Sequence, residues 1–448
     1  MLRPVDIHKS YLKHLTAFAQ THGVTISEDV RNESGAIIIP KGRQLDSVLT
    51  DKIVNHNLKV PLEQCITLNH NFDGVSLLKG YQQVFQQYPD IGLFHERWQL
   101  QKPLKRACRY YHEFPLLIQK MTILKAVMPQ LFKQAIYSAY ISLAIANQLD
   151  APEEECSAAF LAGLVHDIGI LHLDTDLVTT KGDYTPEQWH AMQRHTLIGH
   201  DILKSIEHMP NVIAKAVLEH HERVDGSGYP FSKKGLELSV MGQIIGMADT
   251  CIALYRRELS ARNLGIDALL PILQLNPDMY CRKVFHATVK LIADIQWPVK
   301  RVYSDEKMPE LMSRLKLENE WIHHDYSVLY GLVTSVRPHL EDTKRSTMLT
   351  NMAQRIHRCL VRSGILQKEH SEWMLNSFVS QNQEDFIAIE RLEIMYGEIK
   401  WQMKQLKKLL FLLWRNQHKD HPELDVLVKK GLLQIEQYHK HHTEPELH

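Results

Sequence analysis

From about Pro115 to its C-terminus the chain carries helical patterns almost without interruption, and this limits the fold more than any other feature. Residues 121–150 are apolar around much of the helix circumference, so at least the second half of this stretch should form a buried helix. Asp150, Pro152 and three glutamates then predict a helix start, because an acid caps a helix and negative charge favours its N-terminal end. We therefore expect a mainly α protein.

Apolar residues recur every seven positions between residues 389 and 413, which predicts one continuous stripe along a long helix. We call this set the seven-residue stripe after its repeat distance. Its eight members are Ile389, Leu392, Tyr396, Ile399, Met403, Leu406, Leu410 and Leu413. The pattern covers fewer than four heptads, so two interpretations stay open. The helix either packs within its own domain or forms a homodimer with a second copy.

The N-terminal part of the chain has a different pattern. Residues 29–40 (DVRNESGAIIIP) predict two short strands joined by a turn at Asn32 to Gly35, and residues 45–58 suggest a helix. A chain of 448 residues is expected to form two or three domains. We divide it into a small N-terminal α+β sensory or adaptor domain (1–114), a central helical domain (115–298) and a C-terminal helical interaction domain (299–448).

Composition argues against some classes of protein. Lys plus Arg and Asp plus Glu number 52 each, so net charge gives no reason to expect a broad basic surface for nucleic acid. Six scattered cysteines without a CxxC pair fit a reducing compartment. The N-terminus lacks a signal-peptide core, and no apolar run approaches the roughly 20 residues that span a bilayer. We expect a soluble, cytoplasmic protein without a membrane partner.

A histidine–aspartate pair, His166 and Asp167, ends an apolar helix and is followed by Gly169, where a helix can stop and the backbone can turn. His195 lies on a second predicted helix that begins near Thr185. Taken alone, each of these histidines is more often a capping or packing residue than a ligand.

A pair of adjacent histidines, His220 and His221, closes a third helical run, and Asp249 follows another apolar run. What favours a function is the order of the four elements, HD, H, HH and D, each on or at the end of a helix with an apolar face. Imidazole and carboxylate ligands without a thiolate suit first-row divalent ions such as Fe, Mn, Ni or Zn. The pattern therefore indicates a metal site.

Together with HHERVDGSGYP at 220–230, these motifs resemble the HD-GYP family of the HD phosphohydrolase superfamily over roughly residues 115–295. The resemblance implies an HD-type helical bundle that hydrolyses the bacterial second messenger cyclic di-GMP with one or two divalent metal ions. It implies that Asp167 is catalytic and bridges two ions. The metal ligands that it implies are His166, Asp167, His195, His220, His221 and Asp249.

The same resemblance implies a recognition role for the glycine-rich loop that follows the histidine pair. Its expected substrate-binding residues are Asp225, Gly226, Gly228 and Tyr229. The expected partners are cyclic di-GMP or a related nucleotide and, in signal transduction, GGDEF-type or other signalling proteins.

Several positions depart from the family pattern. Tyr137 and Lys133 stand where the family places a histidine and a glutamate, and a phenol with a pKa near 10 is a poor ligand for divalent ions. Ile170 replaces a lysine that could contact the scissile phosphate. Ile252 and Glu258 stand at or near the positions of an aspartate and a phosphate-binding arginine. These departures weaken the first of the two implied metal sites.

Two functions of different classes follow from these observations. The retained HD pair and the intact HHERVDGSGYP favour a cyclic di-GMP phosphodiesterase. The departures favour a degenerate relative that binds a metal, a nucleotide or a protein in signalling without hydrolysis. We lean toward the enzyme.

Overall fold

The computed structural model confirms a mainly α protein, in which the only sheets among the described residues are two short strand pairs. It describes residues 4–54, 56–180, 184–262, 264–298, 300–341, 343–367, 369–370, 372–373, 376, 383–417 and 422–443. The chain divides into two compact units: unit 1 (Met1–His221 and Leu238–Ile252) and unit 2 (Glu222–Glu237 and Ala253–His448). Within the described ranges, no helix combines the length and apolarity that crossing a membrane requires.

The N-terminal part of unit 1 contains the strands. β1 (Val24–Ile26) pairs antiparallel with β4 (Ile66–Leu68), and β2 (Val30–Arg31) pairs antiparallel with β3 (Ile37–Ile39). The second pair confirms the predicted hairpin, and Gly35 in its turn has a φ of 86°, which glycine adopts without strain. The predicted helix at 45–58 is α2 (Ser47–Val54).

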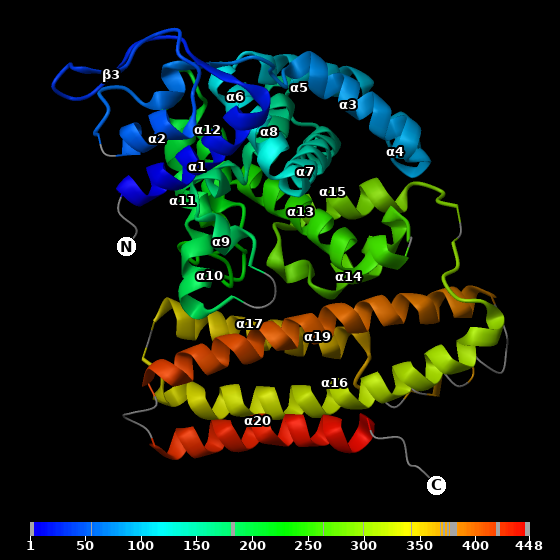
Figure 1. Ribbon diagram of the computed structural model, residues 1–448. Coiled ribbons are helices and arrows are strands. Elements are labelled where there is room, and N and C mark those ends of the chain that lie inside the picture. Colours follow the sequence, from blue (N-terminus) through cyan, green and yellow to red (C-terminus); the bar gives the residue numbers. More distant parts are fainter. Residues whose placement is uncertain are drawn as a thin grey trace. The chain divides into compact units, whose positions relative to one another are not determined.

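The rest of unit 1 is a helical bundle (Figure 1). Its other helices are α1 (Pro4–His22), η1 (Leu62–Gln64), α3 (Gly74–Gln87), α4 (Pro89–Arg97), α5 (Gln101–His112), α6 (Pro115–Val127), α7 (Pro129–Gln148), α8 (Glu153–Val165), η2 (Ile168–His172), α9 (Thr175–Val178), α10 (Pro186–Gln193), α11 (His195–Lys204), α12 (Asn211–Glu219) and α13 (Val240–Leu254, in unit 1 up to Ile252). α7 packs along α8, and α8 also contacts α5 and α12.

Two predicted helices differ from the structure, one at a proline and one at a residue with a left-handed backbone. The pattern at 121–150 is divided between α6 and α7 at Met128, because a residue before a proline is driven out of the helical conformation. α8 begins at Glu153, with its three glutamates in the first turn as predicted. Asp150 has a φ of 53° and lies outside this helix, and Pro152 is the N-cap, so the acid does not cap it.

The second predicted helix is also divided. It begins as expected at α10, where Thr185 and Gln188 form a reciprocal capping box. α10 ends at Gln193, and His195 is the first residue of α11. The candidate ligand therefore lies at the start of a helix of its own.

Unit 2 contains the loop Glu222–Glu237 and the C-terminal helices. Its elements are η3 (Gly235–Glu237), the π-helix η4 (Tyr255–Leu259), η5 (Ser260–Arg262), η6 (Ile266–Ala268), α14 (Leu269–Leu275), η7 (Pro277–Met279), α15 (Arg282–Ala293), η8 (Asp305–Lys307), α16 (Met308–Val336), η9 (Arg337–His339), α17 (Lys344–Ser363), α19 (Gln383–Gln417) and α20 (Pro422–Thr443). α16 packs against α19 and α20, and α19 also contacts α17 (Figure 1).

The seven-residue stripe lies on α19 and is buried along its whole length. Its residues join one apolar core with side chains of α16 and α17. Of the two interpretations, the structure shows a long helix packed within its own unit. The division at residues 114 and 298 into three domains stays a prediction.

Candidate metal centre

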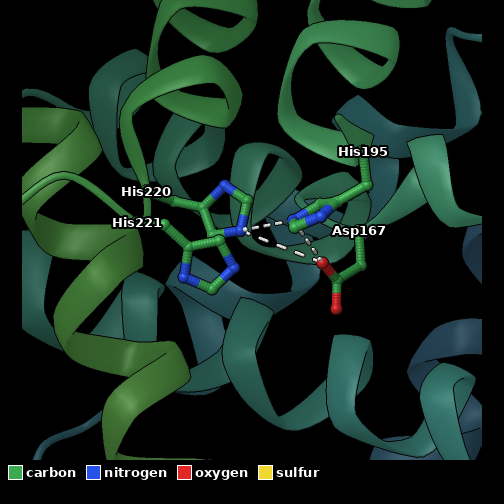
Figure 2. Close-up of side chains that lie close together, drawn as sticks. All are labelled: Asp167, His195, His220 and His221. Carbon is green, nitrogen blue, oxygen red and sulfur yellow. Dashed lines mark hydrogen bonds and ion pairs between the residues drawn. The ribbon is translucent and has the colours of Figure 1, made fainter. Parts of the chain in front are cut away.

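Four of the six predicted ligands form a single cluster in unit 1. Asp167, His195, His220 and His221 each offer a ligand atom, and these atoms lie within 4.8 Å of one another (Figure 2). They come from three places in the bundle: the junction of α8 and η2, the start of α11, and the end of α12. These side chains lie at helix ends, so His220 and His221, which directly follow α12, can both face the cluster.

Backbone carbonyl groups fix the orientation of three histidine rings. In each case Nδ1 lies 2.7–2.8 Å from the carbonyl oxygen three residues earlier. A carbonyl oxygen only accepts, so Nδ1 carries a hydrogen, and in the neutral ring Nε2 carries a lone pair. The pairs are His166 with Gly163, His195 with Met192, and His220 with Val217. This arrangement is typical of metal-ligating histidines.

The Nε2 atoms of His195 and His220 lie near Asp167. The Nε2 atoms of His195 and His220 lie 3.4 Å apart, and Asp167 Oδ1 lies 3.3 Å and 3.8 Å from them (Figure 2). Two lone pairs at this separation repel each other unless a proton or a metal ion lies between them. The donor set of neutral imidazoles and a carboxylate therefore fits a divalent first-row ion.

The second oxygen of Asp167 faces the other predicted ligands. His166 Nε2 lies 3.2 Å from Asp167 Oδ2 and 3.7 Å from Asp249 Oδ1. This nitrogen is buried and makes no hydrogen bond within the described part of the chain. His221 Nδ1 lies 3.9 Å from Asp249 Oδ2. All six predicted ligands are thus neighbours, and Asp167 presents one oxygen to each side, as a bridging carboxylate would.

The charges of the cluster depend on one another. Burial alone would raise the pKa of the Asp167 carboxyl, but His166, His195 and His220 hold it well below its usual range. Burial, together with His166 and His195, lowers the pKa of His220 to about 3. Burial also opposes a charge on His166, but Asp167 and Asp249 overcome it and raise the pKa of that ring. His220 is therefore neutral at pH 7, the state that binds a metal.

Two glycines allow the helix ends to approach each other. A Cβ atom on Gly169 would lie 2.1 Å from the carbonyl oxygen of His195 and 2.8 Å from the backbone nitrogen of Gly199. Gly169 lies inside η2, so its role is close packing and not the helix stop that the sequence suggested. Gly199 is a site residue that we missed, and its only signal is a glycine within a helical pattern.

The residues that depart from the family pattern have structural contacts of their own. Ile170 packs in an apolar cluster with Leu173, Leu177 and Ile198. The Nζ atom of Lys133 lies 5.9 Å from the centre of the Tyr137 ring. Ile252 is buried. An apolar core thus surrounds the position where the family has a phosphate-facing lysine.

Glu258 belongs to unit 2 and forms part of a buried charge network there. Its Oε1 accepts a 2.8 Å hydrogen bond from Arg257 Nε. Arg257 also pairs with Glu398, and its guanidinium lies 4.3 Å from the centre of the Trp401 ring. Arg257, the neighbour of Glu258, therefore contacts two side chains of α19.

The HHERVDGSGYP segment leaves α12 and enters unit 2 after His221. Glu222 organises the following loop, since its carboxylate accepts hydrogen bonds from the backbone nitrogens of Phe231 at 2.6 Å and Lys233 at 3.0 Å. Gly226 has a φ of 76°, which confirms that it supplies a turn. The Tyr229–Pro230 peptide bond is cis. Substrate binding by Asp225, Gly226, Gly228 and Tyr229 stays a prediction.

Comparison with known proteins identifies the region that contains the cluster. Residues 119–280 match the family model described as an HD domain. A cyclic di-GMP phosphodiesterase of Thermotoga maritima is 32% identical over 35% of this chain and 43% of its own length. The cyclic di-GMP phosphodiesterase response regulator RpfG of Xanthomonas campestris is 33% identical over 30% of this chain and 36% of its own.

A third relative has a different named substrate. The 3'3'-cGAMP-specific phosphodiesterase 1 of Vibrio cholerae is 29% identical over 29% of this chain and 30% of its own length. The chain thus spans less than half of each of these relatives. The matched region holds the six predicted ligands and the HHERVDGSGYP segment. Residues 119–280 therefore form an HD domain of the HD-GYP type.

Proposed function

We propose that the HD domain hydrolyses cyclic di-GMP in bacterial second-messenger signalling, by metal-dependent cleavage of a phosphodiester bond. The observation that carries the proposal is the placement of Asp167, whose Oδ1 faces His195 and His220 and whose Oδ2 faces His166. Imidazoles on both sides of one carboxylate suit a pair of divalent ions. The relatives named as cyclic di-GMP phosphodiesterases support this substrate.

The residues divide into two groups for metal binding. His195, His220 and His221 would hold one ion with Asp167, while His166 and Asp249 would hold a second ion with the same carboxylate. Bound ions supply neutralisation of the phosphate charge and lower the pKa of water to about 7. The identity of the metal, among Fe, Mn, Ni and Zn, and its count are part of the proposal.

The chain itself supplies orientation and a fixed charge. The carbonyl groups behind the three rings hold each Nε2 toward the cluster, so no ring has to rotate or lose a proton from Nδ1. The imidazoles around Asp167 keep its carboxylate ionised. We assign Asp167 the catalytic role, because both sides of the centre depend on that charge.

The experiment compares matched histidine variants of the full chain. The chain is reloaded with Mn²⁺ or Fe²⁺ and given cyclic di-GMP or 3'3'-cGAMP, and the linear product is measured by chromatography. His220→Ala combined with His221→Ala should lower turnover at least about a hundredfold and reduce the bound metal per chain. His200→Ala on α11 is the control, since this ring lies beside Asp201 and outside the cluster.

A second candidate function is a signalling module that binds its metal and nucleotide without hydrolysis. It is favoured by Ile170, an apolar residue that packs in an apolar cluster at the position where the family has a lysine. If the metal-loaded wild-type chain binds cyclic di-GMP but forms no linear product, this second function replaces the first. Product that disappears in Asp167→Asn would exclude it.

The remaining proposals concern the setting of the protein. We infer a cytoplasmic location and interaction with GGDEF-type or other signalling proteins, as cyclic di-GMP signalling requires. A homodimer through the C-terminal helices would use exposed side chains of α19 such as Phe411, because the seven-residue stripe is buried. Sedimentation of the wild-type chain and of Phe411→Ser tests this dimer.

A further inference from the structure

The glycine-rich loop is attached to a C-terminal helix that lies outside the matched HD domain. Arg355 of α17 places its Nη1 3.2 Å from Asp225 Oδ2 and donates a 2.7 Å hydrogen bond from the same nitrogen to Ser227 Oγ. One turn earlier on α17, the Asn351 side chain donates to the backbone carbonyl of Asp225 at 2.6 Å. All of these residues belong to unit 2.

The ion pair between Arg355 and Asp225 is buried. The side chain of Arg355 is 5% exposed and that of Asp225 is 9% exposed. Removing two charges from water carries a penalty that offsets much of their attraction. The Arg355 Nε atom also lacks a hydrogen-bond partner within the described residues. A buried guanidinium with one unsatisfied donor contributes little net stability, so we assign it the role of fixing the conformation of the loop that it contacts.

The geometry that it fixes is the turn at the centre of the loop. Asp225 Oδ1 accepts a 2.9 Å hydrogen bond from the backbone nitrogen of Ser227, while Oδ2 pairs with Arg355. Gly226 between them has a left-handed backbone. The Asp225 carboxylate therefore closes the turn by its bond to Ser227, and Arg355 of α17 fixes the position of that carboxylate. Both Asp225 oxygens are engaged in the protein.

We infer that Arg355 is a positioning residue that fixes the Asp225–Ser227 turn for recognition of the cyclic dinucleotide. Its partner Asn351 holds the main chain of the same turn. Because α17 begins 64 residues after the matched domain ends at residue 280, the C-terminal helices are part of the recognition apparatus. This inference rests on the proposed function, in which the loop contacts the nucleotide.

The test uses three variants of the full chain. Arg355→Met keeps a long side chain without charge, and Arg355→Lys keeps the charge without the planar fork. Arg391→Met is the control, because Arg391 in the same unit makes an exposed 3.1 Å ion pair with Asp267. For each variant we measure KM and kcat for cyclic di-GMP, bound metal per chain, and hydrogen–deuterium exchange of the peptide covering residues 222–237.

Arg355→Met should raise KM at least about tenfold, change kcat by less than about threefold, and leave metal content unchanged. Exchange should rise in residues 222–237 and stay unchanged in the peptides around the metal ligands. Arg355→Lys should fall between wild type and Arg355→Met, and Arg391→Met should match wild type. An unchanged KM, unchanged exchange in the loop, or a general rise in exchange over the whole chain would each overturn the inference.

Failure of the proposed function gives a different result. If the metal-loaded wild-type chain hydrolyses no cyclic dinucleotide, binding of cyclic di-GMP by titration calorimetry replaces KM. A dissociation constant raised at least about tenfold in Arg355→Met, with increased loop exchange, then supports the positioning role without hydrolysis. Binding that is absent in the wild type overturns both.

Discussion

The protonation states of individual residues decide whether the centre can accept a metal. His220 has no exposed surface, its Nδ1 donates to Val217, and its pKa is lowered to about 3 by burial and by His166 and His195. It therefore stays neutral at pH values where an unfolded histidine would take up a proton. A residue that resists protonation in the folded state makes folding less favourable in acid.

This property predicts a pH dependence of stability in the metal-free chain. Below about pH 6.5 the unfolded chain binds a proton at His220 that the folded chain does not, so the free energy of unfolding falls by up to about 1.4 kcal/mol per pH unit. The contribution is absent above pH 6.5 and accumulates down to about pH 3. His220→Gln should show a shallower decrease between pH 6.5 and 5 in urea titrations with EDTA. His200→Gln, which alters an imidazole outside the cluster, should keep the wild-type slope.

At the scale of elements, the centre is made by helix ends that touch. η2 carries Asp167 at its start and approaches α11 through Gly169 and Gly199. Periodicity and capping residues predicted the first turn of α8, the start of α10 and the buried stripe of α19, because these signals act within a few turns. They did not predict the close approach, because contact between two backbones depends on residues that are far apart in sequence.

Replacing Gly169 should separate these two elements. In Gly169→Ala the new Cβ meets the backbone of α11, so the free energy of unfolding should fall by about 2 kcal/mol or more. Because His195 moves away from Asp167, metal affinity should fall at least about tenfold. Gly331→Ala in α16 is the control, since its Cβ meets no atom within 4 Å and alanine favours a helix. Calorimetric metal titration and denaturant unfolding measure both effects, and equal behaviour of the two variants would contradict the prediction.

At the scale of the whole molecule, the chain forms two compact units, and each unit combines segments that are far apart in sequence. The three-domain division stays a prediction. We placed the predicted boundaries at residues 114 and 298 from the chain length and from the change in the local residue pattern along the sequence. The structure joins residues 1–114 to the HD helices in unit 1, and joins the glycine-rich loop to the C-terminal helices in unit 2. The pairing of Asp225 with Arg355 spans 130 residues, and no local pattern announces it. The six candidate ligands could be selected from the sequence because their order is itself a motif, and their side chains lie close together in the structure.

A buried ion pair joins the N-terminal part of unit 1 to its helical part. Lys120 on α6 lies 3.0 Å from Glu63 of η1, 3.3 Å from His172 of η2 and 4.0 Å from the centre of the Tyr11 ring. Lys120 is only 1% exposed, and burial lowers its pKa, while Glu63 opposes that change. The predicted sensory domain thus contacts the short helix that follows Asp167.

Removing one member of this pair should be more harmful than removing both. Lys120→Met leaves Glu63 buried without its cation, and should lower the free energy of unfolding by about 3–5 kcal/mol. The double variant Lys120→Met with Glu63→Leu should recover most of that loss. Lys429→Met, which breaks an exposed pair with Asp425, should change stability by less than about 1 kcal/mol. Denaturant unfolding followed by circular dichroism compares the three, and additive losses in the double variant would contradict the prediction.

The three carbonyl groups behind the histidine rings belong to Gly163, Met192 and Val217, and each contributes only its main chain to the centre. An alanine scan would leave all three oxygens in place, so any effect that it showed would come from packing, as at Gly163, where a Cβ would lie 2.7 Å from Ser142 Oγ. Only backbone chemistry, such as an amide-to-ester exchange that weakens the acceptor, would reveal what they do.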